Sequence, residues 1–145
     1  MTVSASAATD LAVCGASVGY GYFPKYGLSA LSDESGKWQE EKISSGRITL
    51  TVNDADEFDV LIADARGSVF SSRADGAAVI ALNVSDLHIA VLVTNRPNYA
   101  ETYTFFRNAD GQAEVMWTSL KYGTLIPKAS ALRAPCSYFA LPINN

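Results

Sequence analysis

Between residues 38 and 122, short runs rich in β-branched and aromatic residues are interrupted by turn residues roughly every ten positions. This rhythm leaves no room for helices between the runs. It predicts an all-β fold: an antiparallel up-and-down meander that forms a closed or nearly closed barrel, with a β-sandwich as the alternative. We expect strands at residues 38–43, 47–52, 58–65, 68–73, 77–84, 87–94, 99–108 and 112–122.

Two further strands are predicted outside this region, for a total of eight to ten. Residues 16–23 form the first, which several glycines weaken, and residues 130–139 form the last. We expect these two strands to pair and to close the sheet. Residues 25–36 are predicted to be irregular and are the candidate functional loop, and one short helical turn is expected either there or in residues 124–130. Residues 1–12 are predicted to be a flexible leader, with residues 13–145 as a single domain.

The hairpin at residues 99–122 predicts which side chains share a face. Asp75-Gly76 and Asp110-Gly111 are typical of two-residue type I′ turns. A turn at Asp110-Gly111 places Arg107 opposite Glu114 and Phe105 opposite Met116. The face that we expect to point inward then gathers the candidate ligand-binding residues Tyr99, Glu101, Tyr103, Phe105, Met116 and Leu120, together with Tyr122. The other face is mostly small and polar, with Trp117 and Phe106 as an apolar patch.

Glu101 is the one acid on this predicted aromatic face. A buried carboxylate is costly unless it is paired, so Glu101 needs a tyrosine hydroxyl, an arginine, water or a ligand. Two interpretations stay open. Glu101 is either a structural residue hydrogen-bonded by Tyr99 and Tyr122 near the strand end, or the polar anchor of an apolar ligand site.

Three short motifs resemble the lipocalin, or more broadly calycin, pattern. Gly36-Lys37-Trp38 leads into the first of the eight meandering strands, Asn98-Tyr99 precedes the seventh, and Arg133 lies where a late arginine packs on the tryptophan. The resemblance implies an up-and-down barrel that holds a small apolar ligand. The chain departs from the pattern in having a strand before Gly36 and no helix before Arg133.

Cys14 and Cys136 lie near the two ends of the predicted sheet, and the chain has no other cysteines. The ends of a compact domain often lie close together, so a disulfide between these residues is geometrically plausible. Two buried, reduced thiols are the alternative. A disulfide would favour an exported, periplasmic or secreted protein, and free thiols a cytoplasmic one. The first residues lack the features of an intact secretory signal.

Charge and composition argue against two classes of partner. The formal net charge is −4 and the eleven Lys and Arg residues are scattered, so we expect no nucleic-acid partner. The longest clean apolar run, residues 89–93, is far shorter than the roughly 20 residues that a membrane-spanning helix needs, so we expect no membrane insertion.

The sequence offers little conventional active-site chemistry. His88 is the only histidine and lies in an apolar run, and the acids at 54–57 lack the glycine and the distal glutamate of a calcium loop. We therefore predict no metal and no cofactor. An enzyme would have to use Glu101 or Asp64 as a general base with a tyrosine as the acid.

Three functions remain in competition. We favour a non-enzymatic barrel that binds a small apolar ligand through the residues named above. The first alternative is an interaction module that forms a homo-oligomer through the apolar patch of Trp117 and Phe106. The second is an enzyme at the mouth of the barrel.

Overall fold

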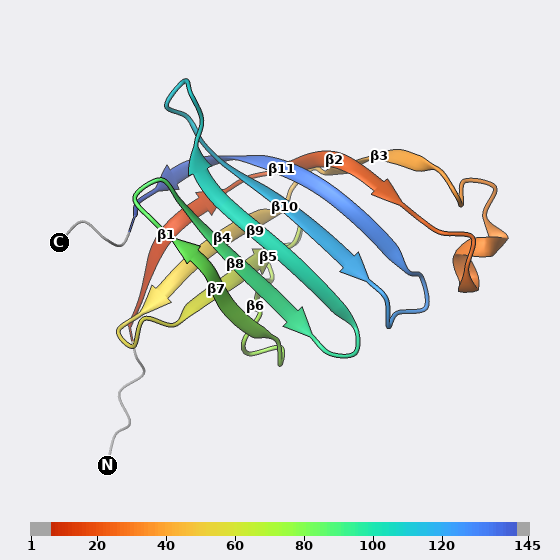
Figure 1. Cartoon of the computed structure of the whole chain (residues 1–145), viewed down its shortest axis with the longest axis horizontal. Coiled ribbons are helices and arrows are strands. Elements are labelled where there is room, and N and C mark those ends of the chain that lie inside the picture. The colour runs from red at the N-terminus through yellow and green to blue at the C-terminus, as the bar shows by residue number, and fades with distance from the viewer. Residues whose placement is uncertain (1–6, 142–145) are drawn as a thin grey trace, which may run out of the picture.

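One strongly curled antiparallel sheet accounts for most of the chain (Figure 1). The structure, a computed structural model, describes residues 7–141. The elements are β1 (Ala8–Cys14), β2 (Ser17–Tyr22), the 3₁₀ helix η1 (Gly27–Leu31), β3 (Trp38–Ile43), β4 (Arg47–Asn53), β5 (Phe58–Ala63), β6 (Val69–Ser71), β7 (Ala78–Val84), β8 (His88–Asn95), β9 (Tyr99–Arg107), β10 (Ala113–Lys121) and β11 (Lys128–Phe139). The predicted strands and the short helical turn in residues 25–36 are confirmed, with shifted boundaries.

The sheet is an up-and-down barrel with one open seam. Its strand order is β6-β5-β4-β1-β11-β10-β9-β8-β7. The first strand therefore lies between β4 and the last strand, and the remaining neighbours follow in sequence. The sheet curls through 252°, and its edges remain 10 Å apart. Hydrogen-bonded strands lie about 4.8 Å apart, so this gap is too wide for a ladder. The nearly closed meander is confirmed, and the sandwich does not form.

Only short breaks separate β1 from β2 and β3 from β4, and the sheet branches at these breaks. β1 pairs with β11 and β4, whereas β2 pairs with β11 and β3. β2 and β3 therefore extend away from the barrel, as Figure 1 shows at the upper right. The predicted pairing of residues 16–23 with 130–139 is confirmed. Gly19 permits this pairing, because a Cβ at that position would lie 2.1 Å from the Ala131 carbonyl oxygen.

The prediction of a leader at residues 1–12 is wrong for residues 8–12, which belong to β1. This strand lies between β4 and β11, where both neighbours supply ladder hydrogen bonds. Small residues are sufficient in such a central position, and Leu11 and Ala12 are buried. The Ala, Ser and Thr residues that dominate positions 1–10 concealed the strand. Residues 1–6 lie outside the described part of the chain.

The disulfide between Cys14 and Cys136 is present and joins neighbouring strands. These two residues are direct partners in the β1–β11 pairing, and Cys14 is buried. The bond links positions that are 122 residues apart. It therefore fastens the first strand of the barrel to the last.

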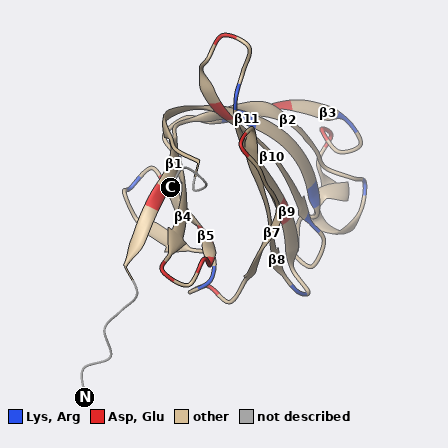
Figure 2. Cartoon of the chain, turned by 60° about the vertical axis from the view of Figure 1, so that its left-hand side comes forward, with Lys and Arg blue, Asp and Glu red and all other residues tan. Residues whose placement is uncertain are grey.

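Apolar side chains fill the centre of the barrel. Leu50, Val60, Val91, Phe105 and Val115 come from five strands and are all fully buried. Figure 2 views the curled sheet with β1, β4 and β5 on one side and β7 to β10 on the other. These side chains occupy the space between the two sides. The core is thus the lumen of the half-barrel itself.

Three hairpin turns share one design that the sequence analysis did not recognise. They span residues 53–57, 64–68 and 108–112, and in each the first residue donates its N–H to the carbonyl of the fifth. The side-chain oxygen of the first residue, Asn53, Asp64 or Asn108, accepts the N–H groups of the third and fifth residues. The fourth residue has a positive φ. This geometry is a type I turn followed by a G1 bulge.

The predicted register of the β9–β10 hairpin is therefore wrong by one residue. Gly111 has a φ of 80°, whereas Asp110 does not have a positive φ, so a type I′ turn is excluded. Phe105 lies opposite Val115, and Tyr103 lies opposite Trp117. Because alternate residues of a strand face opposite ways, this shift reverses the predicted faces of β10. The Asp75-Gly76 hairpin prediction is also wrong, since β6 and β7 do not pair.

Two substitutions test the shared turn design, because they should change the free energy of unfolding in opposite directions. Gly111→Ala should lower the free energy of unfolding by about 1 kcal/mol, because alanine disfavours a positive φ and its Cβ has no neighbour within 4 Å to compensate. Asp56→Gly, at the equivalent turn position with a φ of 59°, should raise it by about 0.5 kcal/mol. Urea denaturation measures both. Changes of the same sign at the two positions would contradict the shared design.

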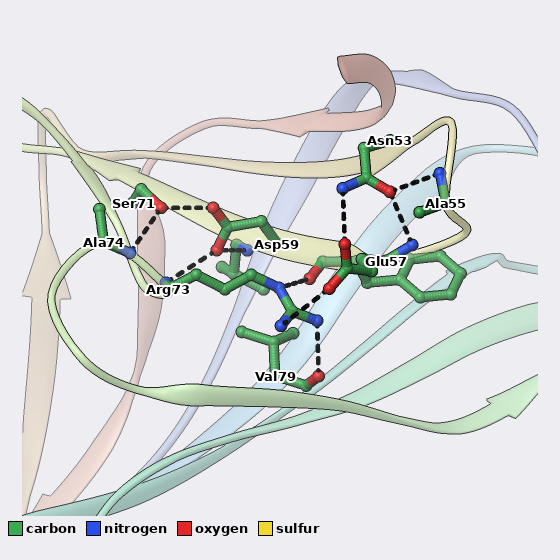
Figure 3. A network of polar contacts seen from close by, with 10 residues as sticks. Asn53, Ala55, Glu57, Asp59, Ser71, Arg73, Ala74 and Val79 are labelled. Carbon is green, nitrogen blue, oxygen red and sulfur yellow. Dashed lines mark hydrogen bonds and ion pairs between the residues drawn. The ribbon is translucent and has the colours of Figure 1, made fainter. Parts of the chain in front are cut away.

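Arg73 bridges the open seam of the barrel (Figure 3). Its Nε donates a hydrogen bond to the Phe58 carbonyl in β5 at 2.6 Å, and its Nη2 donates to the Val79 carbonyl in β7 at 3.0 Å. Asp59 holds the connection in place by accepting bonds from the Arg73 N–H and the Ser71 hydroxyl. One guanidinium group therefore joins β7 to the part of β5 that β6 does not cover, where a backbone ladder is missing.

Candidate functional site

Two adjoining clefts with shared lining residues hollow the half-barrel. One of them lies where β9 begins and β10 ends. Phe139 lines neither cleft and is buried in the core, where the Arg107 guanidinium carbon lies 5.7 Å from the centre of its ring. Ile62 and Trp117 line both clefts. We call this region the mouth site.

The first cleft of the mouth site has polar and apolar lining in nearly equal parts and a volume of about 730 Å³. It mixes hydrogen-bond donors and acceptors with aromatic rings. Its lining residues are Ile62, Asp75, Asn95, Asn98, Tyr99, Glu101, Tyr103, Trp117, Lys121 and Thr124.

The second cleft is apolar and smaller, with a volume of about 390 Å³. It lies where β1 gives way to β2 and β3 to β4. Its walls are the side chains of Ile43, Ile48, Ile62, Ala63, Ala65 and Trp117, and small residues such as Gly15, Ser17 and Gly46 leave the space between them. Clefts of this kind favour the binding of an apolar group, because binding removes its surface from water.

Aromatic stacking positions the inner wall of the mouth site. The Trp117 ring stacks on the Tyr103 ring with centroids 5.4 Å apart and planes 11° apart. The Trp117 indole N–H donates to the Ser17 hydroxyl at 3.0 Å. The Tyr103 hydroxyl donates to the Glu101 carboxylate at 3.1 Å. The tryptophan, the tyrosine and the glutamate therefore form one connected group with fixed orientations.

The two tyrosines of the mouth site are hard to ionise. Burial raises the pKa of Tyr103 well above its usual value of 10.0, and the Glu101 carboxylate raises it further. Burial also raises the pKa of Tyr99, with further increases from Glu101 and Asp75 and an opposing contribution from a hydrogen bond with Asn95. The burial and the neighbouring carboxylates that raise both pKa values also disfavour another negative charge in this cleft.

Three of the six predicted ligand-binding residues meet in the mouth site, namely Tyr99, Glu101 and Tyr103. Phe105 belongs to the filled core. Met116 and Leu120 are exposed, and Met116 lines a separate groove on the outer face. The one-residue register shift explains their location. The Glu101 interpretation is resolved in part, because Tyr103 rather than Tyr99 or Tyr122 donates to its carboxylate.

Sequence reasoning missed Trp117 and Ile62, which connect the two clefts. The sequence predicts Trp117 on an outer apolar patch with Phe106, but Trp117 faces inward, so that patch does not form. The Asn108-Ala109-Asp110-Gly111 sequence was the signal that would have given the correct register. Ile62 gave no comparable signal, because its strand is apolar at several consecutive positions.

The residues considered for catalysis are not brought together as a pair. Asp64 lines the apolar cleft, but its carboxylate accepts the Arg66 and Ser68 backbone N–H groups and so serves the turn. Glu101 lines the other cleft. Within residues 7–141, no group of three or more His, Cys, Asp or Glu residues is arranged to hold a metal ion. The same residues include no helix long and apolar enough to cross a membrane.

Comparisons of the chain with protein-family models, curated proteins and solved structures give no match in any of the three. The lipocalin resemblance therefore has no support from a family match. Of the features that the resemblance implies, the structure shows the strongly curled antiparallel sheet. The fold defines a small β half-barrel domain with a hollowed mouth.

Proposed function

We propose that this protein binds a small molecule at the mouth site and that the apolar part of the ligand lies against Trp117 and Ile62. The observation that carries the proposal is the pair of adjoining clefts in an otherwise filled barrel. The ligand position differs from the sequence expectation, because core side chains occupy the lumen. Aromatic and aliphatic walls with a few placed polar groups are typical of small-molecule sites.

The mouth site favours binding over catalysis. The Tyr103 hydroxyl, the natural acid beside Glu101, is buried and held by that carboxylate. Burial and the neighbouring charge also make this phenol a poor proton donor at neutral pH. A rigid wall that orients a ligand is the simpler role for this group.

The disulfide supports a location for this function outside the reducing cytosol. Such bonds persist mainly in oxidising compartments, so we infer that the protein is exported. A protein there would meet small molecules directly from the surroundings of the cell.

A neutral, apolar fluorescent dye such as N-phenyl-1-naphthylamine tests the proposal. The wild-type chain should bind the dye saturably at one site. Ile62→Trp should weaken binding about tenfold or more, because the larger side chain occupies the space shared by both clefts. Titration of dye fluorescence measures the affinity.

The matched control is Leu61→Trp, which places the same side chain on the neighbouring residue of β5. Leu61 faces the outer surface and lines neither cleft. The affinity of the Leu61→Trp variant for the dye should stay within about twofold of that of wild type, which is a small change in the free energy of binding. Absence of saturable binding to wild type, or equal losses in the two variants, would refute a ligand site at the mouth.

A further inference from the structure

Two glutamates point toward the inner side of the sheet, and their environments differ. Glu41 forms an ion pair with Lys128 and accepts a hydrogen bond from the Ser130 hydroxyl at 2.9 Å. Glu101 is half-buried and accepts one bond from Tyr103, and within residues 7–141 no cationic side chain lies within 4.0 Å of its carboxylate. A partly desolvated carboxylate without a counter-charge is an unfavourable arrangement in the unliganded protein.

Ser119 is a second unsatisfied group and lies behind the cleft lining, next to Glu101. It lies directly opposite Glu101 in the β9–β10 pairing and on the same face of the sheet. The residue is 93% buried, since its relative exposure is 7%. Among the described residues its hydroxyl oxygen is the buried side-chain atom that lacks a hydrogen-bond partner. Buried polar groups are normally paired, so this hydroxyl also indicates a missing partner.

The rest of the first cleft suits a positive charge. Tyr99 and Trp117 supply aromatic rings, whose faces attract cations, whereas the Tyr103 ring is buried and stacks with Phe105 and Trp117. Asp75 adds a second carboxylate to the lining, and Lys121 is an opposing charge with an exposed side chain. Burial is the main cause of the raised pKa values of both tyrosines, and the Glu101 carboxylate raises both further.

We propose that the ligand of the mouth site is an amphipathic amine, with its protonated amino group at Glu101 and Ser119 and its apolar body in the cleft between Trp117 and Ile62. This inference rests on the proposed function and specifies its ligand class. An ammonium group provides several N–H donors, enough for the free carboxylate oxygen of Glu101 and the Ser119 hydroxyl together. The adjoining apolar cleft accounts for the other half of the molecule.

Three probes with the same phenyl body and different head groups test the inference: 2-phenylethylamine, 2-phenylethanol and 3-phenylpropanoate. Calorimetric titration of the full chain at pH 7 should show that the amine binds about tenfold more tightly than the alcohol. The acid should bind more weakly than both. Glu101→Gln retains an acceptor for Tyr103 but removes the charge, so the preference for the amine should disappear while the alcohol still binds.

Glu114→Gln is the control, because it makes the same change of charge on the outer face of β10, where Glu114 pairs with Arg133. It should leave the amine preference unchanged. Equal binding of amine and alcohol to wild type, or a preference that survives Glu101→Gln, would overturn the amine assignment and leave the proposed site intact. Failure of all three probes, together with failure of the neutral dye, would overturn both proposals.

Discussion

Replacing both cysteines with alanine is expected to lower the free energy of unfolding by about 5 kcal/mol. The bond between Cys14 and Cys136 closes a loop of 122 residues, and a loop of this length removes much conformational entropy from the unfolded chain. Small domains are stable by only about 5–15 kcal/mol, so the loss is a large fraction of the total. Urea denaturation of the double variant measures it.

The position of the disulfide strengthens this expectation. β1 and β11 are neighbours in the middle of the strand order, and their pairing brings the two ends of the chain together. Without the bond, this long-range pairing must form at full entropic cost. Reductant should bring wild type to the stability of the double variant and leave the variant itself unchanged. An equal denaturation midpoint for oxidised wild type and variant would show that the bond contributes nothing.

Arg73→Met is expected to cost about 2–4 kcal/mol and to open the seam between β5 and β7. The substitution removes charged hydrogen bonds to two backbone carbonyls, each worth roughly 1.5–3 kcal/mol, from a side chain that is partly exposed. The 3.8 Å contact with Glu57 adds little, because both side chains are solvated. Urea denaturation gives the loss of stability, and hydrogen exchange locates it.

The expected exchange pattern distinguishes opening of the seam from general loosening. Amides of β5 and β7 should lose protection first, whereas those of β10 and β11 should keep theirs. Arg66→Met is the control, because Arg66 lies in an exposed turn and its side chain has no hydrogen bond or ion pair within the described chain. Arg73→Lys should not rescue stability, since an ammonium lacks the planar fork that reaches both edges. Uniform loss of protection would refute a role specific to the seam.

Local sequence signals predicted the strands well and their partners less well. Turn residues and alternating apolar positions marked the strands from β2 to β11, because both signals depend on neighbouring residues. The β9–β10 register failed because Asn108 captures two N–H groups and adds a residue to the turn. The strand β1 was missed because it begins among small Ala, Ser and Thr residues, and its pairing with β4 and β11 joins distant parts of the chain.

The residues of the candidate site likewise fall into those that local sequence could predict and those that it could not. Tyr99, Glu101 and Tyr103 alternate along one strand, so the pleat alone places them on one face. Trp117 and Ile62 complete the site from other strands, and no local pattern connects them. The gap that Arg73 bridges is equally invisible in the sequence, because it depends on how far the whole sheet curls.

By itself the sequence determined an all-β chain, the rhythm of its strands, a cysteine pair near its ends and an aromatic strand face that carries one acid. Tertiary structure alone decided that the barrel stays open by 10 Å, that its lumen is filled, and that a hollow remains at Trp117 and Ile62. The physical reason is the range of the interactions. Backbone preference and alternation act over a few residues, whereas curl, packing and cleft shape sum contacts between strands that are distant in the chain.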